Sequence, residues 1–236
     1  MIGNGMNHNS TNQPSEPGSF RLIATLALAG LFSGAAIVGI YEATLPLITA
    51  NKAAALQSAV FKVLPGIESF REIGYRDGSL FVRESHGPFD GESIYAGFDK
   101  TDHLAGYAIP CEGPGFQDTI ALLYGYRPNE GRITGLEVLE SRETPGLGDK
   151  IYKDPDFVAN FRALNPDPEI IAVKKGKKSA PNEIDAITGA TISSVAVVRI
   201  INEAHARWMP RLMDPADGNS VHQLYREFKE KQQPES

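Results

Sequence analysis

The segment from Leu22 to Tyr41 limits most strongly what this chain can form. It holds no charged residue and consists mostly of Leu, Ala, Ile, Val and Gly. As a helix, a segment of about 20 such residues is about 30 Å long, which matches the hydrocarbon core of a membrane. Gly30 and Gly34 suit a membrane span, where small residues allow close contacts between helices. The sequence therefore predicts a single transmembrane helix at residues 20–42.

A cleaved signal peptide is the alternative explanation of this segment. Signal peptides usually have a shorter apolar core and a more basic start. Here a polar segment, residues 1–19, comes first, and we expect it to be a disordered tail before an uncleaved anchor. Arg21 before the span and Glu42 after it favour a cytoplasmic N terminus. The following domain would then lie on the periplasmic side of the inner (cytoplasmic) membrane.

The remaining chain changes from a helical pattern to strands and back. Residues 51–64 predict a stalk helix that ends at Pro65 and Gly66. Strands are expected at 80–83, 93–98, 104–109, 119–126, 133–140 and 169–173, and helices at 156–164 and 192–213. This order indicates an α+β fold, with a mainly antiparallel sheet and flanking helices. We expect this domain at residues 43–213 and a polar C-terminal segment at 214–236.

Composition excludes several classes of function. The net charge of −6 gives no general attraction to nucleic acid. Lysines cluster only around Gly176, in what is best interpreted as a solvated turn. The one cysteine, Cys111, cannot form an intramolecular disulfide, and no His or Cys lies near it. We therefore expect no nucleic acid partner and no metal site.

The segment from Ile184 to Ser194 has a pattern suited to phosphate. It is predicted to run from a strand end into a helix start, with Thr191 as the N-cap. Unpaired N–H groups and the positive dipole end of a helix bind phosphate, and Gly189 and Ala190 let a ligand approach the backbone. Hydroxyl groups that could bind or carry a phosphate are those of Thr188, Thr191, Ser193 and Ser194. On residue chemistry alone, an ordinary turn and helix cap is the favoured explanation of the segment, because helix caps are more common than phosphate sites.

A second segment, Glu143 to Lys150, contains Pro145, Gly146 and Gly148 and predicts a defined loop. Such a loop could lie against a flat aromatic ring. By itself it could also be only the connection from the last strand to the helical region.

Together these two segments resemble the FMN-binding domain of the G subunit of the Rnf electron-transport complex and of the C subunit of the sodium-pumping NADH:quinone reductase. In that family the pattern Asp-x-x-Ser/Thr-Gly-Ala-Ser/Thr-x-Ser/Thr marks covalent flavinylation. The residues that match it are Asp185, Thr188, Gly189, Ala190, Thr191 and Ser193. The loop Glu143-Thr144-Pro145-Gly146-Leu147-Gly148 is similar to the second family motif, which flanks the isoalloxazine. The stretch from Tyr107 to Pro128 resembles the Rnf protein more closely.

The resemblance implies that Thr191 carries FMN through a phosphoester bond. It further implies contacts to the cofactor from Thr188, Gly189, Ala190, Ser193, Ser194, Glu143, Thr144, Gly146, Leu147, Gly148 and Lys150. A separate flavin transferase would attach the FMN, with Asp185 either in its recognition site or capping nearby backbone.

The implied function is one electron-transfer step in a membrane complex that couples ferredoxin and NAD oxidoreduction to ion movement. The implied partners are the other subunits, the transferase and membrane lipid. No residue is expected to be catalytic, and no turnover is expected from the chain alone. The alternatives are the C subunit of the sodium pump and a stand-alone flavinylated periplasmic protein.

Overall fold

The structure is a computed structural model that describes residues 18–84, 89–213 and 221–232. Residues 1–17 of the tail expected at 1–19 lie outside the described residues, as do residues 85–88, 214–220 and 233–236. The chain divides into two compact units, Met1–Lys52 and Ala53–Ser236, and each is described by itself.

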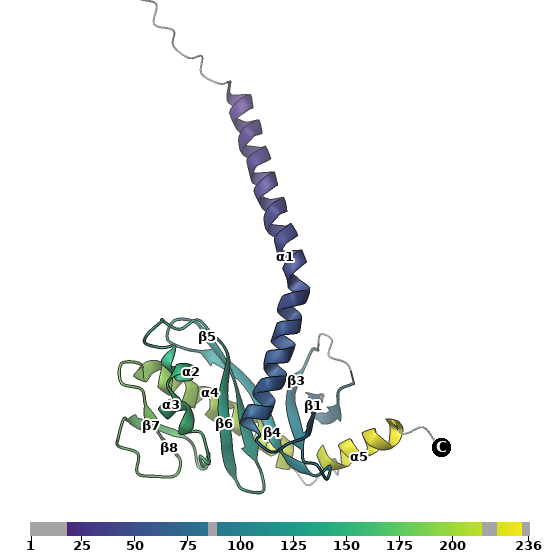
Figure 1. The fold of residues 1–236 in the computed structure, drawn as a ribbon, viewed down its shortest axis with the longest axis vertical. Helices are drawn as coiled ribbons and strands as arrows, with labels where there is room; N and C mark the ends of the chain where they lie inside the picture. The colour runs from purple at the N-terminus through teal and green to yellow at the C-terminus, as the bar shows by residue number, and fades with distance from the viewer. Residues whose placement is uncertain (1–17, 85–88, 214–220, 233–236) are drawn as a thin grey trace, which may run out of the picture. The chain divides into compact units, whose positions relative to one another are not determined.

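Helix α1 runs without interruption from Ser19 to Val63 (Figure 1). It joins the predicted anchor and the predicted stalk into one element. Its N-terminal part is lined by exposed apolar side chains, such as Leu26 and Phe32. Among the described residues it is the one helix long and apolar enough to cross a membrane.

The second unit is built on a six-stranded antiparallel sheet with the order β2-β1-β3-β4-β5-β6. The strands are β1 (Ser69–Arg76), β2 (Ser79–Val82), β3 (Glu92–Phe98), β4 (Leu104–Pro114), β5 (Thr119–Arg127) and β6 (Arg132–Ser141). Five of them lie where the sequence predicts strands. The prediction missed β1, because its first residues are only half-buried and polar ones interrupt the apolar alternation.

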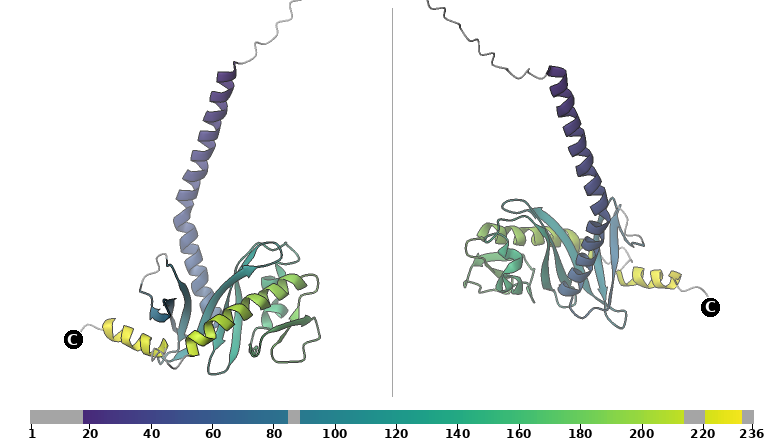
Figure 2. Two further views of the ribbon diagram at one scale, coloured as in Figure 1. Left: turned by 180° about the vertical axis from the view of Figure 1, so that it is seen from behind. Right: turned by 45° about the horizontal axis from the view of Figure 1, so that its top comes forward.

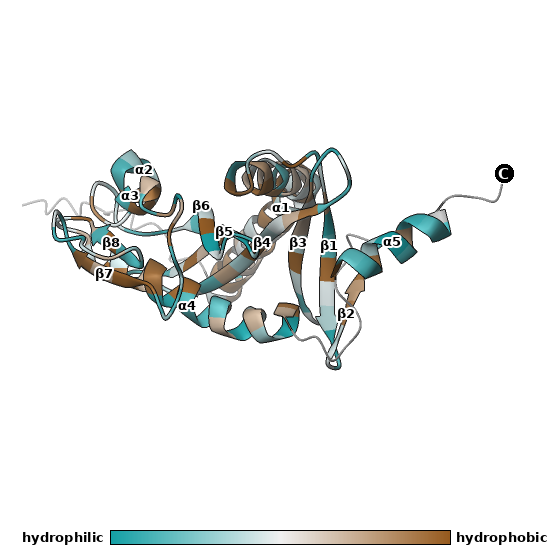
Figure 3. Cartoon of the chain, turned by 90° about the horizontal axis from the view of Figure 1, so that it is seen from below, coloured by the Kyte–Doolittle hydropathy of each residue, from teal (hydrophilic) through white to brown (hydrophobic). Residues whose placement is uncertain are grey.

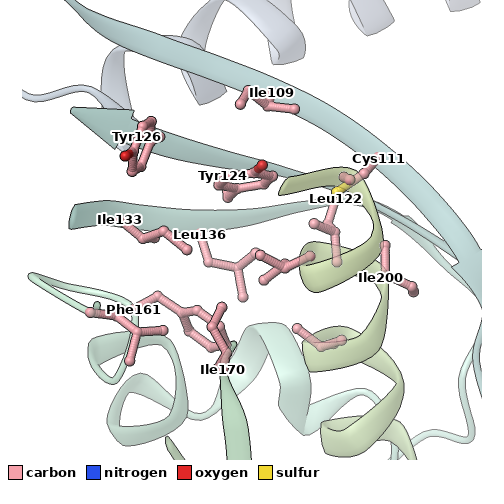
Figure 4. Close-up of a cluster of buried hydrophobic side chains, with 14 of the residues drawn as sticks. Ile109, Cys111, Leu122, Tyr124, Tyr126, Ile133, Leu136, Phe161, Ile170 and Ile200 are labelled. Carbon is pink, nitrogen blue, oxygen red and sulfur yellow. The ribbon is translucent and has the colours of Figure 1, made fainter. Parts of the chain in front are cut away.

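The two faces of the sheet are covered by different helices. Side chains alternate between the faces of a strand, so Leu122 and Tyr124 pack under α4 (Thr191–Met213), whereas Leu123 packs against the last turns of α1. Figure 4 shows the α4 side of this core, and Figure 2 shows α4 crossing that face. On the α1 side, a Cβ atom at Gly125 would overlap the carbonyl oxygen of Val63. The absence of a side chain at this position allows α1 to approach the sheet closely.

A smaller set of elements follows β6. These are α2 (Lys150–Lys153), α3 (Pro155–Ala159), β7 (Ile171–Lys174) and β8 (Glu183–Ala186). Strands β7 and β8 form a parallel pair, and Figure 3 shows apolar stretches on β7 and on the part of α4 beside it. Helix α5 (Val221–Gln232) lies within the predicted polar C-terminal segment.

The predicted helix at 156–164 was wrong in its extent. Helix α3 ends at Ala159, Ala163 has a φ of 61°, and Leu164 pairs with Ile133 of β6. A left-handed residue cannot continue a right-handed helix. The α+β class, the mainly antiparallel sheet and the flanking helices are confirmed.

Candidate functional site

The two motifs identified in the sequence meet at the start of α4. Strand β8 ends at Ala186, a turn follows, and α4 begins at Thr191, as the strand-to-helix prediction requires. The other motif forms the connection from β6 to α2. The Ser193 hydroxyl donates a hydrogen bond to Oε2 of Glu143 at 2.5 Å, so the two motifs are in contact.

The prediction of Thr191 as the N-cap was wrong. Thr191 is the first residue of the helix, and its Oγ1 lies 3.5 Å from the carbonyl oxygen of Ile187. Ser194 secures the turn instead: its Oγ accepts a hydrogen bond from the Ile187 N–H at 3.0 Å and donates one to the Ala190 carbonyl at 2.9 Å. The hydroxyl of Thr191 is therefore not needed as a cap.

Burial separates the hydroxyl groups of this segment into two pairs. Ser193 and Ser194 are 3% and 0% exposed, and both are hydrogen-bonded within the protein. Thr188 and Thr191 are exposed. Only this second pair presents oxygen atoms that a ligand can reach.

Gly189 separates the two exposed threonines and has a φ of +85°. This left-handed conformation strains any residue with a Cβ atom. The glycine of the motif is therefore required by the backbone. Ala190, which follows it, is buried and 6% exposed.

Glu143 links the motifs through its carboxylate. Its Oε1 accepts hydrogen bonds from the N–H groups of Phe116 and Gln117, each at 2.9 Å, and its Oε2 accepts one from the Ser193 hydroxyl at 2.5 Å. The residue is 5% exposed. Its carboxylate is thus committed to holding three segments together.

There is no room for a side chain at either of two positions beside the Glu143 carboxylate, and both are glycines. A Cβ atom at Gly148 would lie 2.5 Å from Oε2 of Glu143, and one at Gly115 would lie 2.5 Å from Oε1. Burial acts to raise the pKa of Glu143, but the hydrogen bonds from Ser193, Gln117 and Phe116 outweigh it and lower the pKa below its ordinary value. Glu143 is therefore held as the anion.

The segment around Phe116 and Gln117 was missed by the sequence reasoning as part of the site. Besides the backbone bonds to Glu143, Oε1 of Gln117 accepts a hydrogen bond from the Thr144 hydroxyl at 2.8 Å. The signal available in the sequence was Pro114 and Gly115, a turn directly before these residues.

The rest of the second motif forms a tight turn beside α2. Gly146 has a φ of +79°, and Leu147 is 50% exposed. Asp149 is buried and pairs with Lys153, whose Nζ lies 2.6 Å from Oδ2 of the aspartate. Lys150, at the start of α2, lines a hollow with Ile187 and Thr188.

Asp185 lies on β8, before the turn that leads into α4. Its Oδ1 accepts a hydrogen bond from the Gly176 N–H at 2.7 Å, in the connection between β7 and β8. The carboxylate also lines a small hollow with Asp154 and Asn160. It thus caps neighbouring backbone and stays accessible from the surface.

Comparison with known proteins identifies relatives over most of the chain. Residues 115–206 match the family model of the FMN-binding domain. The chain is 30% identical over 187 residues to the G subunit of the ion-translocating oxidoreductase complex of Methanosarcina acetivorans, covering 78% of this chain and 91% of the relative. The chain belongs to the family of G subunits of these complexes. It is also 29% identical to the G subunit of the proton-translocating ferredoxin:NAD(+) oxidoreductase complex of Clostridium ljungdahlii, over 78% of this chain and 89% of that protein.

Solved structures agree with this family at the level of the fold. NqrC of Shewanella oneidensis superposes with a TM-score of 0.53 at 19% identity, covering 65% of this chain and 91% of that protein. The C subunit of the Na(+)-translocating NADH-quinone reductase of Parabacteroides distasonis gives 0.52 at 19% identity, over 63% and 79%. The matched family model begins at Gly115. It therefore includes Phe116 and Gln117, whose N–H groups donate hydrogen bonds to Glu143.

Proposed function

We propose that this G-type protein carries FMN on Thr191 through a phosphoester bond and transfers electrons within an ion-translocating oxidoreductase complex. The relatives named above are subunits of such complexes. The main support for covalent attachment at Thr191 is that this residue is exposed at the start of α4. Ser193 and Ser194, in contrast, are buried and hydrogen-bonded.

The residues present fit an FMN phosphate at this place. Thr191 begins a long helix, whose first N–H groups lack partners within the helix and favour an anion. Thr188, Gly189 and Leu147 are exposed around it, and a Cβ atom on Gly146 would meet nothing within 4 Å. These residues would hold the cofactor directly, together with Thr144 and Lys150.

The buried residues of the two motifs would stabilise the site. Glu143, Ser193, Ser194, Ala190 and Gly148 would set the shape of the site without touching the flavin. Asp185 would serve the recognition of the chain by the flavin transferase, because its carboxylate stays accessible while capping Gly176.

Bound FMN supplies the redox chemistry, and the protein sets its position and surroundings. We propose that α1 anchors the chain in the inner membrane with a cytoplasmic N terminus. The FMN-binding domain would then lie on the periplasmic side, in contact with other subunits of the complex. Membrane lipid surrounds the exposed apolar part of α1 in this arrangement.

Two other functions predict different behaviour. The C subunit of a sodium-pumping NADH:quinone reductase would assemble with that pump, and a stand-alone flavinylated protein would assemble with neither complex. The identity to G subunits, which extends over most of this chain, favours the first function over both.

The test is to isolate the complex from membranes that express all its subunits and the flavin transferase, with this chain tagged. We expect the other subunits to co-purify and the flavin of the tagged chain to be reduced when the physiological electron donor is added. A tagged chain that carries flavin but purifies alone, or whose flavin is not reduced in the complex, would contradict the proposed role.

A further inference from the structure

A hollow beside the first turn of α4 is lined by three lysines. It has a volume of about 450 Å³ and lies between α2, α3 and the turn before α4. The cationic residues are Lys150, Lys153 and Lys175, and the other lining residues are Asp154, Pro155, Ile187 and Thr188. A volume of this size is within the range of small-molecule sites, which is roughly 300–1,000 Å³.

The two acidic groups nearest this hollow are those of Asp149 and Asp154. Oδ1 of Asp154 accepts a hydrogen bond from the Asp156 N–H at 3.0 Å, which caps α3, and Asp149 pairs with Lys153. Within the described part of the chain, no carboxylate forms an ion pair with Lys150 or Lys175. The lining of the hollow thus contains three lysines and one carboxylate, that of Asp154, and its net charge is positive.

The hollow adjoins the proposed flavin attachment point. Ile187 lines it, and the carbonyl oxygen of Ile187 lies 3.5 Å from Oγ1 of Thr191. Thr188 places an exposed hydroxyl on the same wall. Thr191 is not among the lining residues, so an anion held by the lysines would lie beside the turn that precedes Thr191.

We propose that Lys150 and Lys175 bind a phosphate group in this hollow. Lysine ammonium groups bind phosphate as point charges, and the hydroxyl of Thr188 can donate a further hydrogen bond. The phosphate could belong to the flavin on Thr191 or to a free phosphate compound from solution. The first source rests on the proposed function, whereas the binding of phosphate by the lysines does not.

The experiment uses the full chain in detergent with Thr191→Ala, so that no flavin phosphoester can fill the hollow. Inorganic phosphate and adenosine monophosphate are titrated in and followed by calorimetry. The same titration is made with K150Q/K175Q in that background, and with K175Q alone. The matched control is K177Q/K178Q, which removes the same charge from exposed lysines of the neighbouring turn that do not line the hollow.

We expect saturable binding to the Thr191→Ala chain and a loss of about tenfold or more in affinity in K150Q/K175Q, since charged hydrogen bonds are removed. The control should bind as the parent does, and added salt should weaken binding. Absence of saturable binding, or equal affinity in K150Q/K175Q and the parent, would overturn the proposal. If K150Q/K175Q does not fold, K175Q alone decides, and unchanged affinity there overturns the part assigned to Lys175.

The two sources are separated with the flavinylated wild-type chain. If its own phosphoester occupies the lysines, added phosphate should not bind to it. If phosphate binds to it as it does to Thr191→Ala, the lysines take phosphate from solution. Failure to obtain any flavinylated chain would count against the proposed function but leave the result with Thr191→Ala unaffected.

Discussion

At the scale of single residues, the sequence does not distinguish the hydroxyl groups of the flavinylation motif. The structure does, because they differ in burial and in hydrogen-bond partners. Ser194 closes the turn before α4, Ser193 donates to Glu143, and Thr188 and Thr191 remain exposed. The sequence predicted the segment and the acceptor by resemblance to the family. The structural roles of the two serines could not be predicted from the sequence. Ser193 bonds to Glu143, which is distant in the chain, and Ser194 bonds to backbone atoms of the turn.

Replacement of Glu143 tests its role as the link between the segments. We expect Glu143→Ala to lower the free energy of unfolding by about 1–3 kcal/mol, because buried donors of Phe116, Gln117 and Ser193 lose their charged acceptor. We also expect it to reduce the extent of flavinylation. The measurement is denaturant unfolding of the full chain in detergent, followed by the fluorescence of Trp208, the one tryptophan, which is buried.

The pH dependence of the same variant gives a second measurement. The pKa of Glu143 is lowered in the folded protein, so its stabilisation is complete above its ordinary value of 4.5 and is lost as the pH falls toward the folded pKa. Glu143→Ala should therefore destabilise most above that value and progressively less below it. Glu140→Ala, an exposed carboxylate on β6, is the control. A destabilisation that does not decrease on acidification would contradict the charged role of Glu143.

At the scale of elements, the sequence indicated most of the fold because periodicity is a local property. The strands β3 to β6 and the long helix α4 have clear apolar patterns, and each was predicted close to its observed position. Strand β1 and the short helices α2 and α3 depend on tertiary contacts. The pairing of Leu164 with Ile133, which ends the helical region, joins residues far apart in the chain and leaves no local pattern.

The join between α1 and the sheet gives a prediction about an element. A Cβ atom at Gly125 would overlap the carbonyl oxygen of Val63, so Gly125→Ala should push the end of α1 from the sheet. We expect a loss of about 1–3 kcal/mol, which is typical of overpacking. Thermal unfolding of the full chain measures it. Gly34→Ala is the control, because a Cβ atom there meets nothing within 4 Å; equal stability of the two variants would contradict the close packing.

At the scale of the whole molecule, the chain combines an apolar N-terminal helix with an FMN-binding domain. The long apolar helix was predictable from composition alone, because an uncharged apolar segment of this length favours a helix long enough to cross a membrane. The side of the membrane on which the domain lies is a proposal that depends on Arg21 and Glu42.

Labelling of single cysteines tests this orientation. Burial raises the pKa of the Cys111 thiol well above its ordinary value of 9.0, so the native cysteine should react slowly with maleimide. A cysteine from Lys177→Cys lies in an exposed turn and should be labelled by an impermeant maleimide in intact spheroplasts. A cysteine from Ser10→Cys should require permeabilised cells. The reverse pattern would contradict a periplasmic domain.

The most direct test of the central claim is the mass of the peptide that contains Thr188 and Thr191. The full chain is produced with an active flavin transferase, digested and analysed by fragmentation mass spectrometry, alongside Thr191→Ala and Thr188→Ala. We predict that the wild-type peptide carries FMN less one water, with the added mass on Thr191, that Thr188→Ala can still carry it, and that Thr191→Ala cannot. An unmodified wild-type peptide, although the transferase modifies a known acceptor, or a modification placed on another residue, would contradict covalent attachment at Thr191.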